Sequence, residues 1–295
     1  MKLIWHFLNP IKWIKAKMFA KKNAAFDKST YDLELYLYSK ILSNDMLHFG
    51  HFDDPDIAPD TISFRTLEDA QMRYAQNIVD QIINKANAVL DVGCGMGGLT
   101  KMIQDNGMQV ECLTPNKNQI DHIKSKYNFS GVHHCKFEQF ESDKTFGTII
   151  NSESLQYINL TEAFEKVGRL LLPDGRWIIV DYFRLDESGI NKSSHLLGHF
   201  HEKVKSEGWK IVHEHDISAN ILPTIAYANM FAERFLKPVK HFAYEKLRFK
   251  KPSLYYMTEG MRESVEAKIA KEQASIDPTM FLNEKRYMFF VLERA

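Results

Sequence analysis

Glycines stand at positions 93, 95, 97 and 98, directly after the apolar run Val89-Leu90-Asp91-Val92. Glycine has no Cβ, so such a stretch can turn sharply and lets a ligand approach the main-chain N–H groups. Nucleotide-like ligands bind at a turn of this kind when a strand precedes it and a helix follows. The stretch therefore predicts a nucleotide-like cofactor, with Asp91, Gly93, Gly95 and Gly97 as candidate contacts.

Several kinds of loop share this glycine pattern. Gly93, Gly95 and Gly98 satisfy the G-x-G-x-x-G spacing of dinucleotide-binding folds. Those folds also carry an acid at the end of the second strand for the ribose, whereas here the second apolar run ends in Thr114-Pro115-Asn116. A loop whose glycines only make a turn is a third alternative, and the strand, loop and helix pattern argues against it.

The elements that must position these residues follow from short apolar runs that alternate with amphipathic segments. Strands are predicted at 88–92, 109–113, 132–137, 148–150 and 176–180. Helices are predicted between them, near 98–105, 117–126 and 161–172. Pro173-Asp174-Gly175 predicts a turn with positive φ at the glycine. This order predicts an α/β fold with a Rossmann-like, mainly parallel sheet.

Two late strands are predicted at 209–212 and 287–292, with helical patterns and many aromatics between them. That separation is too long for a simple turn. Together with residues 1–80, the intervening helices are expected to cap the mouth of the sheet. Four parts are expected: a basic amphipathic N-terminal helix, a cofactor-binding core with cap helices, a helical acceptor-binding insertion and the last strand of the core sheet. Their ranges are 1–30, 31–216, 217–284 and 285–295.

The stretch from Val89 to Gly98 resembles the first motif of class I methyltransferases, which use S-adenosylmethionine. Further segments, over roughly residues 31–215, resemble the branch that contains cyclopropane fatty acid synthases and the sterol, tocopherol and isoprenoid C-methyltransferases. The resemblance implies S-adenosyl-L-methionine as the cofactor. It also favours a methyltransferase over a dehydrogenase.

The resemblance implies contacts along the nucleoside. Thr114, Pro115 and Gln119 belong to a stretch that replaces the usual ribose acid, and in the family its Thr and Gln contact the ribose side. Phe137 would pack on the purine, and Glu138 would accept a hydrogen bond from the exocyclic amine.

Two segments before the glycines, Tyr31-Asp32 and 47–52, resemble those that close over the methionine end of the cofactor. The resemblance implies that Tyr31 and His48 bind its carboxylate, and His51 is a catalytic candidate. An ordinary surface or core position is an equal alternative for both histidines, because one sequence fixes no geometry. Asn151, after the fourth strand, is a further candidate cofactor contact.

Methyl transfer from a sulfonium needs an acceptor held in line and water excluded. Residues 151–158 resemble the Asn-x-Glu-Ser segment of isoprenoid C-methyltransferases. Glu153 is expected to act as a base or to stabilise a cation formed when an alkene is methylated, with Tyr157 as its polar or π-face partner. Alternatively, Glu153 binds only backbone or the cofactor amino group. Gln156-Tyr157 replaces the Glu-His pair of cyclopropane synthases, which argues against cyclopropane formation.

Composition narrows the function classes. Lys+Arg and Asp+Glu number 38 each and the hydrophobic fraction is 44%, which argues against a disordered chain and against a nucleic-acid partner. The three scattered cysteines indicate neither a disulfide framework nor a metal cluster, and the histidine pairs lack further ligands, so no metal site is predicted. With no apolar run of membrane-spanning length and no signal-type stretch, we expect a cytoplasmic location.

Residues 1–22 combine Trp5 and Trp13 with apolar residues at helical spacing and several lysines. This pattern is typical of a helix in a membrane interface, which would place the protein peripherally on the inner membrane face. A helix packed on the core with solvated lysines is the alternative. The basic, aromatic-rich stretch 237–255 is either a solvated helix face or a site for an anionic head group, diphosphate or membrane surface.

These features predict a methyltransferase for a hydrophobic small-molecule acceptor. C-methylation of an unsaturated lipid or isoprenoid is favoured over O- or N-methylation of a natural product or quinone-like acceptor. Nucleotide-dependent reduction and a non-catalytic S-adenosylmethionine-binding protein are the alternatives from other classes. The sequence specifies no oligomeric state.

Overall fold

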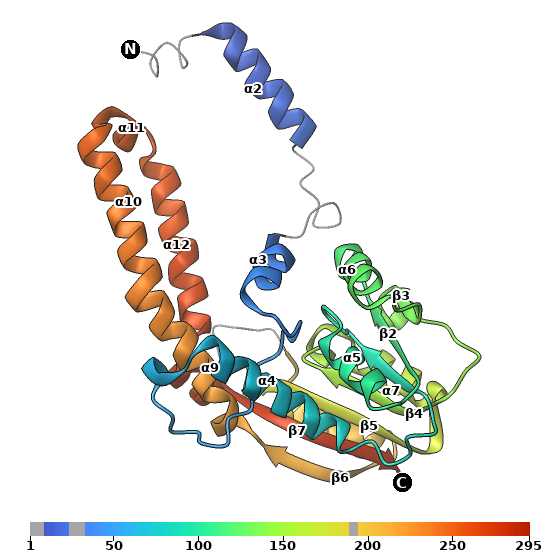
Figure 1. Ribbon diagram of the computed structural model, residues 1–295. Coiled ribbons are helices and arrows are strands. Elements are labelled where there is room, and N and C mark those ends of the chain that lie inside the picture. Colours follow the sequence, from blue (N-terminus) through green and yellow to red (C-terminus); the bar gives the residue numbers. More distant parts are fainter. Residues whose placement is uncertain (1–8, 24–32, 189–193) are drawn as a thin grey trace.

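The computed structural model describes residues 9–23, 33–188 and 194–295. Within them one seven-stranded sheet has the order β3-β2-β1-β4-β5-β7-β6 (Figure 1). Its strands are β1 (Val89–Val92), β2 (Val110–Thr114), β3 (Val132–His134), β4 (Phe146–Ser152), β5 (Leu171–Arg184), β6 (Trp209–Asp216) and β7 (Lys285–Arg294). β1 to β5 are parallel, and β7 lies antiparallel between β5 and β6. The predicted α/β, Rossmann-like fold is confirmed.

Helices precede the sheet, alternate with its strands and fill the insertion before β7. The helices before the sheet are α2 (Pro10–Asn23), α3 (Leu33–Ile41), η1 (Pro59–Thr61) and α4 (Phe64–Val79). Those between strands are α5 (Gly98–Asp105), α6 (Lys117–Tyr127), η2 (Phe137–Gln139), η3 (Leu155–Tyr157), α7 (Leu160–Leu170) and α8 (Leu197–Ser206). The insertion holds α9 (Ser218–Phe231), η4 (Ala232–Leu236), α10 (Lys237–Lys250), α11 (Pro252–Met257), α12 (Glu259–Ser275) and α13 (Pro278–Glu284).

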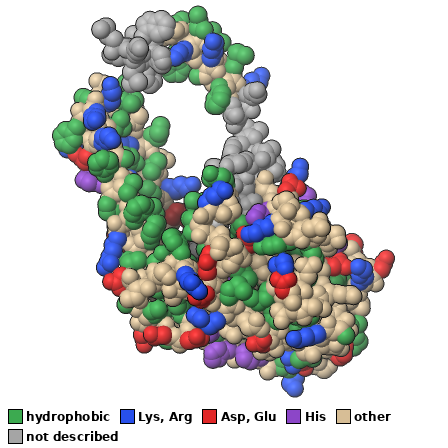
Figure 2. All heavy atoms as spheres, viewed as in Figure 1, with side chains coloured by type: hydrophobic (Ala, Val, Ile, Leu, Met, Phe, Trp, Pro, Cys, Tyr) green, Lys and Arg blue, Asp and Glu red, His purple; other side chains and the backbone are tan. Residues whose placement is uncertain are grey.

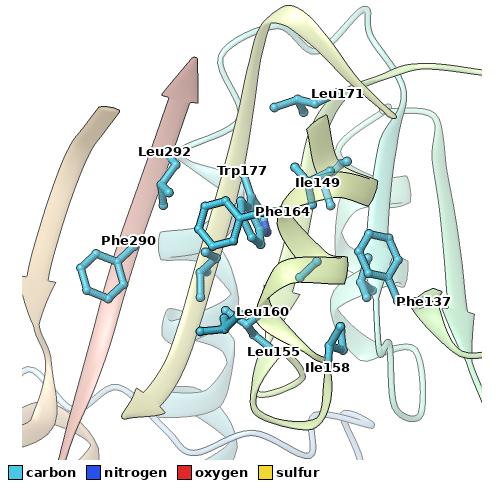
Figure 3. Packing of buried hydrophobic residues seen from close by; sticks show 14 of the residues in the cluster. Phe137, Ile149, Leu155, Ile158, Leu160, Phe164, Leu171, Trp177, Phe290 and Leu292 are labelled. Atoms are coloured by element: carbon cyan, nitrogen blue, oxygen red, sulfur yellow. The ribbon is translucent and has the colours of Figure 1, made fainter. Parts of the chain in front are cut away.

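Both faces of the sheet carry an apolar core. On one face α7 buries a stripe of apolar residues with helical spacing, and Phe164 meets Trp177 of β5 edge to face, with centroids 4.9 Å apart (Figure 3). On the other face α4 packs Tyr74 and Ile78 against the strands. α4 thus belongs to the layer on the sheet, and the segment before it, residues 42–52, reaches the pocket described below.

The turn predicted at Pro173-Asp174-Gly175 is wrong. These residues lie inside β5, at the point where its register with β4 shifts. Gly175 does not have a positive φ. A Cβ at this position would come within 2.9 Å of the carbonyl oxygen of Gly147, so close strand approach is what requires the glycine.

The insertion leaves the sheet at the carboxyl edge of the parallel strands. β6 and β5 both run antiparallel to β7, so β6 points the same way as the parallel strands and ends at that edge, where α9 begins. α9 also contacts the 42–52 segment, because Asn220 Nδ2 donates to the Phe52 carbonyl (2.9 Å) and Thr224 Oγ1 accepts from Gly50 N (3.0 Å). Beyond α9, α10 and α12 project as a helical hairpin (Figure 1).

Candidate cofactor site

A cavity of about 540 Å³ opens at the carboxyl ends of β1, β2 and β4. Gly93 (φ +79°) and Gly95 (φ +55°) form its floor in backbone conformations that favour glycine. A Cβ at Gly93 would come within 2.5 Å of Ser154 Cβ, so the turn after β1 packs directly against the turn after β4. The floor is therefore bare main chain, as a ligand that binds backbone N–H groups requires.

Asp91 and Thr114 lie at the ends of two neighbouring strands and both line the cavity. Thr100 Oγ1 donates to Asp91 Oδ2 at 2.6 Å, and burial raises the pKa of Asp91 to about 6 despite this bond. Thr114 Oγ1 donates to Gln119 Oε1 at 2.5 Å. At the end of the second strand, where a dinucleotide-binding fold has an acid, this site therefore has the hydroxyl of Thr114, which is hydrogen-bonded to the amide of Gln119.

The 42–52 segment covers the cavity and is anchored on α4. Gln71 is buried, and its Nε2 donates to the carbonyls of Met46 and His48, both at 2.9 Å. Glu68 Oε1 accepts from the backbone N–H of Ser43 at 2.7 Å. Gln71 and Glu68 lie on one face of the helix, so α4 fixes the path of this segment.

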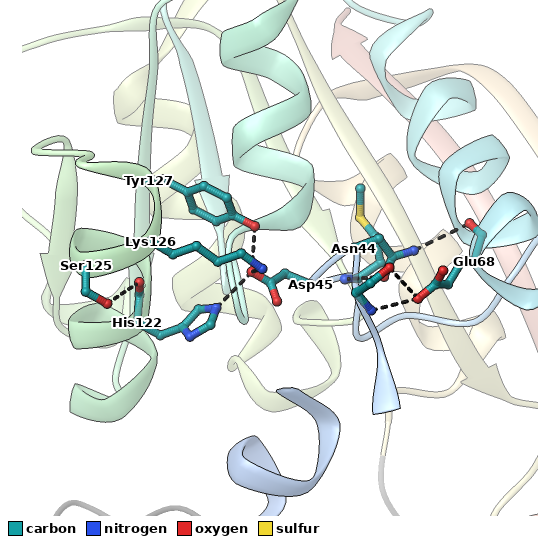
Figure 4. Close-up of polar contacts among 9 residues, drawn as sticks. Asn44, Asp45, Glu68, His122, Ser125, Lys126 and Tyr127 are labelled. Atoms are coloured by element: carbon teal, nitrogen blue, oxygen red, sulfur yellow. Dashed lines mark hydrogen bonds and ion pairs between the residues drawn. The ribbon is translucent and has the colours of Figure 1, made fainter. Parts of the chain in front are cut away.

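Asp45 ties the opposite side of the segment to α6 (Figure 4). Its buried Oδ2 accepts from His122 Nε2 (2.8 Å), Lys126 Nζ (2.8 Å) and Tyr127 OH (2.5 Å). Burial opposes the charge, yet hydrogen bonds from these three side chains leave the pKa of Asp45 lowered. The segment is thus clamped between α4 and α6, with Gly98 beneath it at the start of α5.

His48 projects from this segment into the cavity wall. Its ring stacks on Tyr74 of α4 with centroids 4.0 Å apart, and Nδ1 hydrogen-bonds the Phe49 carbonyl at 2.8 Å. Burial lowers the pKa of His48 to about 4, so the imidazole is neutral at physiological pH. Nε2 is buried and has no hydrogen-bond partner among the residues that the structure describes, which leaves one ring nitrogen available to a ligand.

Glu153 follows β4 in the left-handed backbone region, with φ +52°. Its Oε1 accepts from the backbone N–H of Phe49 (3.0 Å) and from the hydroxyl of Tyr287 on β7 (2.5 Å). Burial raises the pKa of Glu153, and these two hydrogen bonds partly oppose the rise. A non-glycine residue in this conformation costs about 1–3 kcal/mol, a strain that is concentrated at functional sites.

A second buried acid, Asp181 of β5, lies behind Glu153. Its Oδ2 accepts from the backbone N–H of Gln156 at 3.0 Å. Burial raises the pKa of Asp181 to about 8, against that hydrogen bond, and the charge of Glu153 raises it further. Two carboxylates in one apolar surrounding repel each other, so Asp181 is protonated at neutral pH when Glu153 is ionised.

A smaller apolar cavity of about 250 Å³ adjoins the first and shares Gly93, Pro115 and Tyr157 with it. Phe137 and Glu138 line it at the end of β3. Phe137 is almost fully buried. An apolar slot beside a carboxylate suits a flat ring that carries an amine donor.

The structure brings most of the sequence-predicted residues together. Lining the larger cavity are His48, Asp91, Gly93, Gly95, Thr114, Pro115, Gln119, Glu153 and Tyr157. The adjoining cavity adds Phe137 and Glu138. Tyr31 lies outside the described residues.

Three predicted residues lie elsewhere. Gly97 is the left-handed cap of α5 (φ +88°), where a Cβ would meet Ile123, so its role is packing. Asn151 is fully buried behind the cavity, where it donates to Ser154 Oγ and accepts from Trp177 Nε1. His51 is not among the cavity residues; its backbone N–H donates to the Ala70 carbonyl of α4 at 2.9 Å.

Sequence reasoning missed Asp45, Gln71, Tyr74, Tyr287 and Asp181. Tyr74 and Tyr287 share a hydrogen bond of 3.0 Å although they lie on α4 and on β7. Such pairings depend on strand order, for which the sequence carries no local signal. Of the five residues, only Asp45 had a local sequence signal, because it lies beside the 47–52 segment, which resembles a cofactor-binding segment.

Residues 90–179 match the protein family described as "Methyltransferase domain". Sterol 4-C-methyltransferase strm-1 of Caenorhabditis elegans is 25% identical over 193 residues, which cover 61% of this chain and 54% of that protein. Geranyl diphosphate 2-C-methyltransferase of Saccharopolyspora erythraea is 28% identical over 126 residues, which cover 39% of this chain and 44% of that one. The chain thus spans about half the length of the curated relatives it matches.

The fold has a close counterpart among solved structures. A geranyl diphosphate methyltransferase in complex with geranyl diphosphate and sinefungin aligns with a TM-score of 0.66 at 13% sequence identity. The alignment covers 91% of this chain and 96% of that chain. Together with the glycine floor and the strand order, these similarities indicate a methyltransferase fold.

Residues 90–179 are thus similar to a methyltransferase domain, and the chain shares its fold with a solved geranyl diphosphate methyltransferase. The match to a methyltransferase domain indicates S-adenosylmethionine as the cofactor. The cavities fit this cofactor, because they offer a bare glycine floor, a neutral imidazole with an unpartnered nitrogen and an apolar slot beside Glu138.

Proposed function

We propose that the chain methylates an unsaturated carbon of a hydrophobic small molecule of the lipid or isoprenoid type. One observation carries the proposal. The carboxyl group of Glu153 is held at the wall of the cofactor cavity in a strained conformation, with its pKa raised by burial. The names of the relatives, a sterol and a geranyl diphosphate C-methyltransferase, support the acceptor class.

The residues divide the work of binding. We assign the nucleoside to Thr114, Gln119, Phe137 and Glu138, and the methionine end to His48. S-adenosylmethionine, when bound, supplies an electrophilic methyl group carried on a sulfonium. The clamped 42–52 segment excludes water from that end of the cavity.

An alkene carbon that gains a methyl group leaves a positive charge on the acceptor, and loss of a proton restores a neutral alkene. Glu153 suits both needs. Its described hydrogen bonds end on Oε1, which leaves Oε2 as the atom to face the cation and to receive the proton. A raised pKa makes this carboxylate a stronger base than an exposed glutamate. Tyr157, 77% exposed at the rim of both cavities, is placed to contact the acceptor.

Glu153→Gln tests the assignment. The amide keeps the shape and an acceptor oxygen but cannot take up a proton, so we expect turnover to fall by about 10²–10⁴-fold. The assay is transfer of a radiolabelled methyl group to a cell lipid extract, with identification of the labelled product. Calorimetry with S-adenosylhomocysteine should give an affinity within about threefold of the wild type.

Glu187→Gln, at an exposed site, is the matched control and should leave both quantities unchanged. Glu138→Gln should show the reverse pattern, with weakened cofactor binding and a largely retained turnover at saturating cofactor. Lost cofactor binding in Glu153→Gln would make Glu153 a cofactor ligand. A label on oxygen or nitrogen would replace C-methylation with O- or N-methylation.

A further inference from the structure

The α10–α12 hairpin covers no core. No residue of α10 or α11 is buried, and the described residues of α12 are exposed or half-buried. The hairpin stands away from the sheet, with α11 at its tip (Figure 1). A helix pair in this position is expected to present a polar surface to water.

Large apolar side chains are instead open to solvent at and near the tip. Phe249 exposes 75% of its surface, Tyr256 76% and Met257 65%. Phe242 and Met261, one on each helix, are both 64% exposed. Figure 2 shows hydrophobic side chains, with basic ones among them, gathered on this projecting arm. Exposed apolar groups concentrated on one arm mark an interaction surface.

The charges of the hairpin are segregated toward the same end. From 246 to 258 the chain carries four cations, Lys246, Arg248, Lys250 and Lys251, and no acid. Arg248 pairs with Glu245, whereas in the described part of the chain no ion pair is recorded for Lys250 or Lys251. The acids of the hairpin flank this stretch, with Glu245 directly before it and the others from Glu259 onward, and Glu266 of α12 pairs with Lys240 of α10.

We propose that the hairpin tip, residues 246–257, docks on the surface of an anionic lipid bilayer. Aromatic and methionine side chains enter the boundary between head groups and acyl chains, while the neighbouring lysines meet anionic head groups. Among the described residues, no helix has the length and apolar character of a membrane span.

The position of the hairpin relates this membrane contact to entry of the acceptor. The insertion leaves the sheet at the edge where the cofactor cavity opens, so docking by the tip turns that edge toward the bilayer. A hydrophobic acceptor could then reach Tyr157 without passing through bulk water. This route for the acceptor rests on the proposed function, whereas docking of the tip on the bilayer does not.

Any test must distinguish vesicle binding by the hairpin from vesicle binding by α2. It also exposes Trp13, Ile14, Met18 and Phe19, beside lysines. Residues 1–8, part of the N-terminal stretch predicted to contact membranes, lie outside the described residues. Binding by α2 alone would produce a similar preference for anionic lipid.

The experiment is flotation of the full chain with vesicles of phosphatidylcholine alone and of equal phosphatidylcholine and phosphatidylglycerol. We expect binding to the anionic vesicles only, and weaker binding as salt increases. Lys250→Gln/Lys251→Gln should lower the partition coefficient by about tenfold or more. Phe249→Ser/Tyr256→Ser should lower it on the same vesicles by removal of apolar contact.

The matched control is Ile83→Ser/Lys85→Gln, which changes an exposed apolar residue and a lysine at the opposite edge of the sheet, before β1. It should bind vesicles like the wild type. Each variant should keep its affinity for S-adenosylhomocysteine, which shows that the core is folded and keeps this test independent of turnover.

Two results would overturn the proposal. One is unchanged vesicle binding by both hairpin variants, with all binding lost when residues 1–22 are removed; this would assign the contact to α2. The other is a change in molar mass, measured by light scattering, in the hairpin variants with no change in vesicle binding; this would make the tip an interface between copies of the chain.

Discussion

The cofactor cavity and the α10–α12 hairpin place similar residues in opposite surroundings. Around the cavity, acids, a histidine and tyrosines are buried and joined by hydrogen bonds that connect α4, β4, β5 and β7. In the hairpin, no described residue is buried, and its ion pairs lie at the surface. The same types of side chain therefore form a buried hydrogen-bond network in one region and an exposed surface in the other.

This difference teaches where a substitution will be felt. Around the cavity the buried side chains are fixed by one another, so a change that removes one of these contacts affects both the fold and the binding of the cofactor. In the hairpin no described side chain is buried, so a change alters the surface and leaves the fold intact. Paired substitutions, one in each region, test the contrast.

Glycine to alanine should give the largest difference. Gly93→Ala forces a side chain into a left-handed turn and against Ser154, whose hydroxyl is held by the Val92 carbonyl at 2.5 Å. We expect a loss of about 3 kcal/mol or more in the free energy of unfolding, together with greatly weakened cofactor binding. Gly260→Ala in α12 meets no atom within 4 Å and should stabilise the helix by up to about 1 kcal/mol.

Urea unfolding and calorimetry with S-adenosylhomocysteine measure both effects. Equal stability of the two variants would show that the turn after β1 can relax. It would also contradict the expectation that substitutions at the cavity destabilise the fold more than substitutions in the hairpin.

The pH dependence of stability should reveal the buried His48. Its pKa is lowered from 6.5 to about 4 in the folded chain, so its contribution is fully present above about pH 6.5 and is lost as the pH falls toward 4. Between about pH 7 and pH 4 this amounts to about 3 kcal/mol. Urea unfolding of wild type and His48→Asn at both pH values should show a smaller loss in the variant. The same loss in both would place the acid sensitivity in other groups.

A smaller contrast comes from two carboxylates. Asp45→Asn removes the charge that holds His122, Lys126 and Tyr127, and asparagine tolerates the left-handed backbone of this position (φ +55°). We expect a cost of about 2 kcal/mol and a cofactor dissociation constant raised about tenfold. Glu266→Gln in the hairpin, which removes an exposed ion pair, should cost less than about 0.5 kcal/mol. Unchanged cofactor binding in Asp45→Asn would show that the clamp does not control the cavity.

Much of the fold could be predicted because its signals are local. Apolar runs and the turns after them located every strand of the sheet to within a few residues, apart from the length of β5, where Pro173 and Gly175 suggested an end that the strand bridges with a register shift. The antiparallel insertion of β7 between β5 and β6 could not be predicted, since strand order depends on packing across the whole sheet.

The site divides in the same way. Residues at or just after the end of a strand, such as Asp91, Thr114 and Glu153, could be predicted because the carboxyl ends of parallel strands share one edge. Residues reached only by tertiary contact could not be, and Tyr287 is the clearest example. Asn151 shows the converse: it follows the pattern of a contact residue, yet Trp177 and Ser154 take its amide.

The position of β7 between β5 and β6 has a consequence for how the chain folds. One continuous stretch of sequence contains β1 to β5, the glycine turn and the 42–52 segment. In contrast, β7 is separated from β6 by the whole 217–284 insertion and must still pair between β5 and β6. Closing so long a loop is slow relative to the local steps. Glu153 acquires the hydroxyl of Tyr287 only when this strand arrives, so the cofactor pocket should form early and the proton-accepting group should be set last.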